Sequence, residues 1–144
     1  MTQPTEATPG STPAPDEGTL LTFPKGLVGF PHLRAFRLVE PPDAYPLKFL
    51  QSAEDESVSF VCIDPASVKA DYEVPLGTEE AQALQLEAPS DAMVLTLVVI
   101  PEDARHMTTN LAGPLVINVK LRICFQIVLS SDKYPLRFPI LAPI

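Results

Sequence analysis

The sequence predicts an all-β fold with a few short helical turns, and three observations support this fold class. The chain has 144 residues, of which 46% are hydrophobic, which is enough to fill the core of one domain. It contains 17 prolines, and proline interrupts helices because it lacks an amide hydrogen and has a fixed φ. Residues 115–129 carry apolar side chains at every second position, which is the period of a half-buried strand. We therefore expect a strongly curved antiparallel sheet that forms a sandwich or a partly closed pseudo-barrel.

The first 18 residues differ in composition from the rest of the chain. Residues 1–18 include four prolines, four threonines and three acids, and no aromatic or branched aliphatic residue. Such a segment buries too little apolar surface to offset the entropy that it would lose on ordering. We predict a disordered tail at residues 1–18 and a single β domain at residues 19–144.

Short β-prone runs follow one another through this domain, each bounded by proline, glycine or acidic residues. The runs are Thr19–Phe23, Ala35–Val39, Leu47–Leu50, Val58–Asp64 and Leu95–Ile100. The last of them is almost entirely Leu, Val and Ile, as expected of a central strand that is buried on both faces.

Residues 115–129 give the clearest pattern, because apolar residues occupy every odd position. This pattern predicts that the odd-numbered side chains form the buried face. One straight strand of this length would run about 50 Å at roughly 3.3 Å per residue. Since that exceeds the ~30 Å expected across a domain of this size, we expect a hairpin, bulge or bend within Asn118–Ile123.

Three short helical turns are also predicted. Asp64 can cap a turn that has Pro65 at its first position, which suits both residue types. Thr78 can cap a turn over Glu79–Leu84, where the two glutamates favour a helix start. Pro101–Arg105 is the third candidate.

The charge of the chain excludes one function class and suggests another. A formal net charge of −8 argues against direct binding of nucleic acid, which needs a basic face. Residues 54–103 hold twelve acids and a single base, Lys69. These acids either form a patch for a basic protein partner or are solvated carboxylates spread over the surface. The longest uncharged apolar run, Met93–Ile100, is too short to span a bilayer.

No motif with catalytic or metal-binding spacing is present in the sequence. His32 and His106 have no second ligand at metal-binding spacing, and Cys62 and Cys124 lie between apolar neighbours, as core residues do. The N-terminus has no secretory signal pattern, so we expect a reducing cytoplasm. We expect no catalytic residues, no metal and no cofactor, and we favour a monomer. Two other possibilities stay open at this point: a small-molecule-binding β barrel without catalytic activity, and a hydrolase that uses Cys62 or Cys124.

Several short motifs resemble the flagellar assembly factor FliW family, in order and from residue 23 to about residue 140. The motifs are Phe23–Pro31, Leu47–Ser52, Phe60–Pro65, Asp71–Glu73, Met107–Leu111, Pro114–Asn118, Gln126–Leu129 and Tyr134–Arg137. The resemblance implies a non-enzymatic cytoplasmic protein that binds flagellin and antagonises CsrA, an RNA-binding repressor of flagellin translation. It thereby implies that flagellin level is coupled to flagellin translation.

Two groups of residues are candidates for contact with these partners. One is the set on a predicted loop and strand: Met107, Thr108, Thr109, Asn110, Leu111 and Asn118. The alternative for this set is a structural role, since Thr and Asn side chains cap turns. The other group is the acidic run Glu54, Asp55 and Glu56, which we expect to attract basic groups on CsrA.

Overall fold

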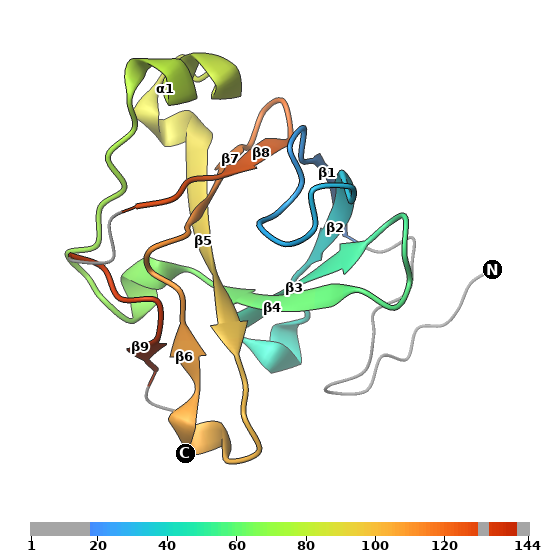
Figure 1. Cartoon of the computed structure of the whole chain (residues 1–144), viewed down its shortest axis with the longest axis vertical. Coiled ribbons are helices and arrows are strands. Elements are labelled where there is room, and N and C mark those ends of the chain that lie inside the picture. Colours follow the sequence, from blue (N-terminus) through green and yellow to red (C-terminus); the bar gives the residue numbers. More distant parts are fainter. Residues whose placement is uncertain (1–17, 130–132, 141–144) are drawn as a thin grey trace.

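The computed structural model describes residues 18–129 and 133–140. Residues 1–17, nearly all of the predicted tail, lie outside the described residues. In the described residues nine strands form one sheet, and Figure 1 shows it curling around a central core, with the helix α1 (Thr78–Leu84) at one end of the molecule. The strands are β1 (Thr19–Thr22), β2 (Ala35–Val39), β3 (Leu47–Ser52), β4 (Ser59–Ile63), β5 (Ala92–Val99), β6 (Thr108–Thr109), β7 (Leu115–Asn118), β8 (Ile123–Gln126) and β9 (Phe138–Pro139).

Seven of these strands close into a barrel, which confirms the predicted fold class and decides against the sandwich. The order of the sheet is β4-β3-β2-β1-β8-β7-β5-β6-β9, and the pairing of β4 with β5 completes the ring. β6 and β9 extend the sheet beyond β5. The pairing of β1 with β8 is parallel and consists of the single pair Thr22↔Ile123, whereas the other strand pairs are antiparallel.

The barrel interior is filled with side chains. Phe23 and Phe36 are fully buried and meet edge to face, with ring centroids 5.0 Å apart. The buried residues packed with them are Leu21, Leu27, Leu33, Leu38, Leu50, Cys62, Leu95, Leu115, Ile117 and Cys124. Such a core stabilises the barrel by burial of apolar surface, and these side chains pack together in the described interior.

The predicted interruption within Asn118–Ile123 is a hairpin turn between β7 and β8. The prediction that the odd positions form one buried face is wrong beyond this turn. The register pairs Ile117 with Cys124, so odd residues of β7 share a face with even residues of β8. Val119 and Leu121, both in the turn, are exposed. The turn holds Arg122 at φ 61°, in the left-handed region, and its N–H donates to the carbonyl of Asn118 at 2.7 Å.

The odd residues of β8 therefore face outward, where α1 covers them. Leu84 of α1 is fully buried and packs in an outer cluster with Val116 and Ile127. The partly buried members of this cluster include Val74, Leu76, Leu86, Ala92, Val94, Phe125 and Leu129. The molecule thus has a second small core on the outer wall of β5, β7 and β8.

The predicted helical turns are present with shifted boundaries in two cases. A 3₁₀ turn occupies Pro65–Ser67, and the Asp64 side chain accepts from the N–H of Ala66, as predicted. The helix α1 begins at Thr78 but its N-cap is Gly77, whose N–H donates to the carboxylate of Glu80, so Thr78 is not the cap. The third turn is Ala104–His106, capped by Asp103 rather than beginning at Pro101.

Four described elements have no counterpart in the predictions: the two-residue strands β6 and β9 and the 3₁₀ turns at Pro42–Ala44 and Pro89–Asp91. The strand predicted at Leu95–Ile100 begins earlier, at Ala92, and ends at Val99. Val99 and Ile100 are exposed, so burial on both faces holds only for part of this strand.

Candidate partner-binding surfaces

The segment Met107–Leu111 is mostly built into the fold. Met107 packs against Ile63, Val98 and Ile140 in a small cluster beside the barrel. Thr109 and Leu111 are buried as well, whereas Thr108 and Asn110 are half-buried. Only the side chains of Thr108 and Asn110 are therefore open to contact with another molecule.

Two polar side chains of this segment make hydrogen bonds within the protein. The Thr109 hydroxyl lies 2.7 Å from the Thr96 hydroxyl and donates to the carbonyl of Leu97 at 2.8 Å. The Asn110 side chain accepts from the N–H of Ala112 at 2.9 Å, which is the local turn geometry expected of Asn.

Leu111 joins three segments that are distant in sequence. Its N–H donates to the carbonyl of Pro135 at 3.1 Å, and its carbonyl accepts from the Tyr72 hydroxyl. The rings of Tyr72 and Tyr134 meet edge to face, with centroids 4.8 Å apart. Three of the motifs identified in the sequence thus contact one another around Leu111.

Asn118 connects α1 to the β7–β8 turn. Its side chain is 2% exposed. The Nδ2 atom donates to the carbonyls of Leu84 and Gln85, at 2.8 and 3.2 Å. The Oδ1 atom accepts from the N–H groups of Lys120 and Leu121, at 2.9 and 3.1 Å. Because both the amide nitrogen and the amide oxygen are hydrogen-bonded, the Asn118 side chain has a structural role and connects the end of α1 to the β7–β8 turn.

The acidic run Glu54–Glu56 forms the exposed turn between β3 and β4. The Glu54 carboxylate accepts from the N–H groups of Arg34 and Ala35, at 2.6 and 3.1 Å. Asp55 accepts from both the hydroxyl and the N–H of Ser57, and these hydrogen bonds lower the pKa of its carboxyl group. The Asp55 carboxylate therefore remains ionised in this turn.

The structure does not bring the candidate residues into one site. Figure 1 shows β6 at one end of the molecule, the β7–β8 turn with α1 at the other, and the β3–β4 turn at the side. Seven of the twelve acids in residues 54–103 are divided in the same way, with three in the β3–β4 turn, two in α1 and two in the loop between β5 and β6, and the other five lie elsewhere along the segment. The dense acidic stretch of the sequence is therefore not one continuous patch on the protein.

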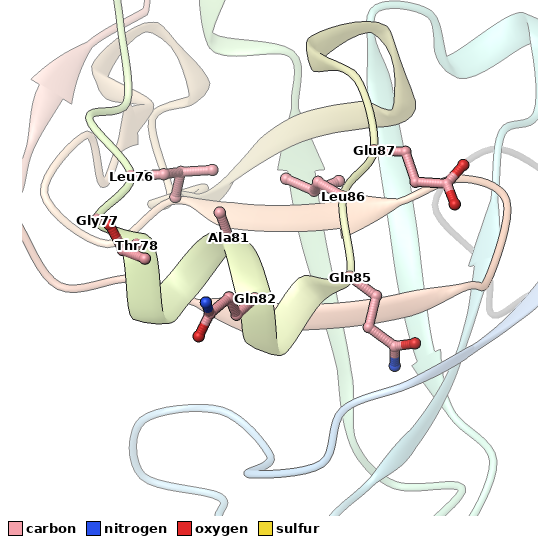
Figure 2. Close-up of a pocket in the computed structure, with 8 residues that line it drawn as sticks. All are labelled: Leu76, Gly77, Thr78, Ala81, Gln82, Gln85, Leu86 and Glu87. Atoms are coloured by element: carbon pink, nitrogen blue, oxygen red, sulfur yellow. The ribbon is translucent and has the colours of Figure 1, made fainter.

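A groove lies on either side of α1, and each groove is lined by a different face of the helix. Figure 2 shows one groove, of about 620 Å³, where the side chains of Leu76, Ala81 and Leu86 point toward the same space and Gln85 and Glu87 point away. A smaller groove of about 280 Å³ lies between the opposite helix face and residues 125–128. No pattern in the sequence predicted either groove.

The cysteines have the properties of core residues. Burial raises the pKa of the Cys62 thiol to about 12 and the pKa of Cys124 well above its usual value. Neither thiol ionises near neutral pH, and a thiol must ionise to act as a nucleophile. Within residues 18–129 and 133–140, no cluster of His, Cys, Asp and Glu side chains is suited to hold a metal ion.

The fold and these surfaces define a small closed β barrel that carries one short helix on its outer wall. None of the helices in the described part of the chain has the length and apolar character needed to cross a membrane. The chain belongs to the FliW family of flagellar assembly factors, because the FliW protein family model matches residues 6–140.

Individual relatives agree with this assignment. The flagellar assembly factor FliW of Clostridium beijerinckii is 36% identical over 126 residues, which cover 88% of this chain and 89% of the relative. That of Carboxydothermus hydrogenoformans is 38% identical over 125 residues, covering 87% and 80% of the two chains. A crystal structure of the flagellar assembly factor FliW matches with a TM-score of 0.80 and 27% identity over 86% of each chain.

Proposed function

We propose that this protein acts in flagellar assembly as a cytoplasmic factor that binds flagellin and antagonises the translational repressor CsrA. The observation that carries the proposal is the match to the FliW family model over residues 6–140. The barrel is consistent with a binding role, since its interior is filled and its two thiols are buried.

A partner switch needs no catalytic centre. It is sufficient that flagellin and CsrA each disfavour the binding of the other, and a coupling free energy of about 1–3 kcal/mol changes the occupancy several-fold or more. When flagellin is abundant it occupies the protein and CsrA is free to repress. When flagellin is exported, the vacant protein captures CsrA and translation resumes.

The test of this function is a competition experiment with purified proteins. We expect the protein to bind flagellin and CsrA separately in titration calorimetry. We also expect it to release CsrA from an RNA that carries the flagellin leader, and we expect added flagellin to restore the CsrA–RNA complex. Absence of binding to both proteins would contradict the proposal.

We further propose that the acidic β3–β4 turn contributes to CsrA binding by electrostatic attraction. Asp55 is held ionised by Ser57, and the exposed Glu56 side chain adds a second charge beside it. Glu54 is less suitable for a test, because its carboxylate also supports the backbone of Arg34 and Ala35. Removing Glu54 would change the fold as well as the charge.

The electrostatic proposal is tested by the double variant Asp55→Asn/Glu56→Gln. Its matched control is Glu102→Gln, an exposed acid in the loop between β5 and β6. We expect the double variant to weaken CsrA binding about threefold to tenfold at low salt and less at high salt, because exposed charges are screened. Unchanged affinity, or binding that does not depend on salt, would rule out this role.

On the β6 side we propose contact through Thr108 and Asn110, the half-buried members of the Met107–Leu111 segment. A Thr108→Arg variant should weaken the binding of one partner without loss of stability, because its side chain is not enclosed. The control variant is Thr109→Val, which removes a buried hydroxyl that is hydrogen-bonded to Thr96 and Leu97. It should lower stability and leave the affinity for the partner unchanged. Equal affinities for wild type and Thr108→Arg would exclude this contact.

A further inference from the structure

The barrel closes through a short seam between β1 and β8. The two strands share only the pair Thr22↔Ile123, with the Thr22 N–H donating to the carbonyl of Arg122 at 2.9 Å. Beyond this pair, β1 leads into the turn that starts at Phe23, and among the described residues no strand lies beside the continuing edge of β8. An unpaired strand edge is a template for another strand.

The hydrogen bonds of the residues that directly follow β8 show which backbone groups face this seam. The N–H groups of Ile127 and Leu129 donate toward β7, to the carbonyls of Pro114 and Ala112, at 2.8 and 2.7 Å. Because successive residues of an extended chain direct their backbone groups to opposite sides, the N–H groups of Gln126 and Val128 point into the seam. Neither donates to any described residue of the chain.

The seam lies in the smaller groove beside α1. Glu79, Glu80 and Ala83 of α1 line this groove together with Lys25 and residues 125–128. Val28 and Val128 are 70% and 74% exposed. The Val28 N–H donates to the Gln126 side chain at 2.8 Å, which places Val28 beside the same edge. The exposed side chains of Val28 and Val128 thus lie beside backbone N–H groups that donate to no described residue.

We propose that this edge, at Gln126 and Val128, receives an extended segment of a partner protein, which adds a strand to β8 in the seam. Alternate side chains of that segment would meet the two faces of β8. On one face lie Val28 and Val128, which favour apolar residues. On the other lies Glu79, which takes part in no ion pair among the described residues and favours a basic residue.

The occupant is therefore an extended segment that combines apolar residues with one basic side chain. This inference rests on the proposed function, since flagellin and CsrA supply the candidate segments. It names the part of the protein that one of them contacts. Main-chain hydrogen bonds to Gln126 and Val128 would give affinity, and the Glu79 contact would fix the orientation.

Amide hydrogen exchange of the full chain, free and bound to flagellin or to CsrA, tests the proposal residue by residue. In the free protein we expect slow exchange at Ile127 and Leu129 and fast exchange at Gln126 and Val128. In one of the two complexes, exchange at Gln126 and Val128 should slow about tenfold or more, since each gains a hydrogen bond protected from water.

Two variants provide a second test that uses affinity. Val128→Pro removes the N–H that faces the seam, and Val128→Ala shortens the side chain but keeps that N–H. We expect Val128→Pro to weaken binding of that partner about tenfold and Val128→Ala about threefold or less, which is the scale of one hydrogen bond. Glu79→Lys should weaken it too, whereas Glu102→Lys, in the distant loop before β6, should not.

Each outcome has a distinct meaning. Slowed exchange at Gln126 and Val128 in one complex supports the proposal. Binding of both partners with unchanged exchange at these two amides would overturn the strand addition and leave the proposed function intact. Slow exchange there in the free protein would show that another part of the chain occupies the seam, and would also overturn it. Binding of neither partner would refute the proposed function and this site together.

Discussion

Replacing Asn118 by Ala should remove the connection between α1 and the β7–β8 turn. The Asn118 amide makes four hydrogen bonds, two to the carbonyls of Leu84 and Gln85 and two to the N–H groups of Lys120 and Leu121. The substitution Asn118→Ala deletes all four bonds and leaves a small space at a position that is 2% exposed. We expect the main effect on stability, with a local effect on the end of α1.

The size of the effect follows from the burial of the partners. Leu84 is fully buried, so its carbonyl loses a partner that water does not easily replace, and the two carbonyls together account for about 2 kcal/mol. The N–H groups of Lys120 and Leu121 lie in an exposed turn, where water substitutes, and they add roughly a few tenths of a kcal/mol each. The expected loss is about 2–3 kcal/mol, or ~10 °C in Tm for a domain of this size.

Urea denaturation measures this loss, and Asn110→Ala is the matched control. Asn110 is half-buried and its side chain accepts one hydrogen bond, from Ala112, so the same substitution there should cost about 1 kcal/mol or less. Exchange of the Leu121 amide should also become faster in Asn118→Ala. A loss no larger than that of Asn110→Ala would refute the structural role that we assign to Asn118.

Three further predictions concern the core and the backbone. Gly26→Ala should lower the free energy of unfolding by about 2–3 kcal/mol, because Gly26 has φ +64° and a Cβ there would collide with the Phe30 carbonyl oxygen. Gly29 has φ +88° with open space around it. Gly29→Ala should therefore cost only about 1 kcal/mol in the same urea assay. Leu84→Ala should cost about 2–5 kcal/mol, since Leu84 is fully buried beneath α1, and equal Tm values for variant and wild type would show that α1 is not packed as described. Burial raises the pKa of the Cys62 thiol to about 12, so iodoacetamide should label the native protein at pH 8 only as fast as it unfolds. The free energy of unfolding should also fall as the pH rises from about 9 toward 12, because the Cys62 thiol ionises at lower pH in the unfolded chain than in the folded protein. Cys62→Ala should make the dependence of this free energy on pH less steep, by up to ~1.4 kcal/mol per pH unit.

Sequence patterns predicted most of the strands because their signals are local. Ala35–Val39 has the predicted bounds, and the turn at Asp64 and Pro65 has the predicted cap. The strand predicted at Leu47–Leu50 continues to Ser52. Ser52 Oγ accepts from the N–H groups of the turn that follows, and the Gln51 side chain donates to the carbonyls of Glu56 and Val58. Polar residues buried by such contacts give no hydrophobic signal.

Other features depend on contacts between distant segments and leave little signal in the sequence. β6 and β9 are two residues long, and they are strands because residues 108–109 pair with residues 98–99 of β5 and with residues 138–139. The candidate residues Met107–Leu111 and Asn118 were identified from resemblance, and burial of Met107, Thr109, Leu111 and Asn118 could not be deduced from residue types. The seam beside β8 requires knowledge of which strands are neighbours.

The seam and the helix have a common origin in the β7–β8 turn. The residues 119–122 between the strands are even in number, so the register places Ile117 opposite Cys124 and directs Phe125 and Ile127 to the outer wall. These apolar side chains need a cover, which α1 provides from above the sheet. A helix on the face of a sheet does not hydrogen-bond to a strand edge, and β1 has already turned away after Thr22. The same register that gives α1 its packing surface therefore directs the N–H groups of Gln126 and Val128 away from β7, to a side where no described strand pairs with them.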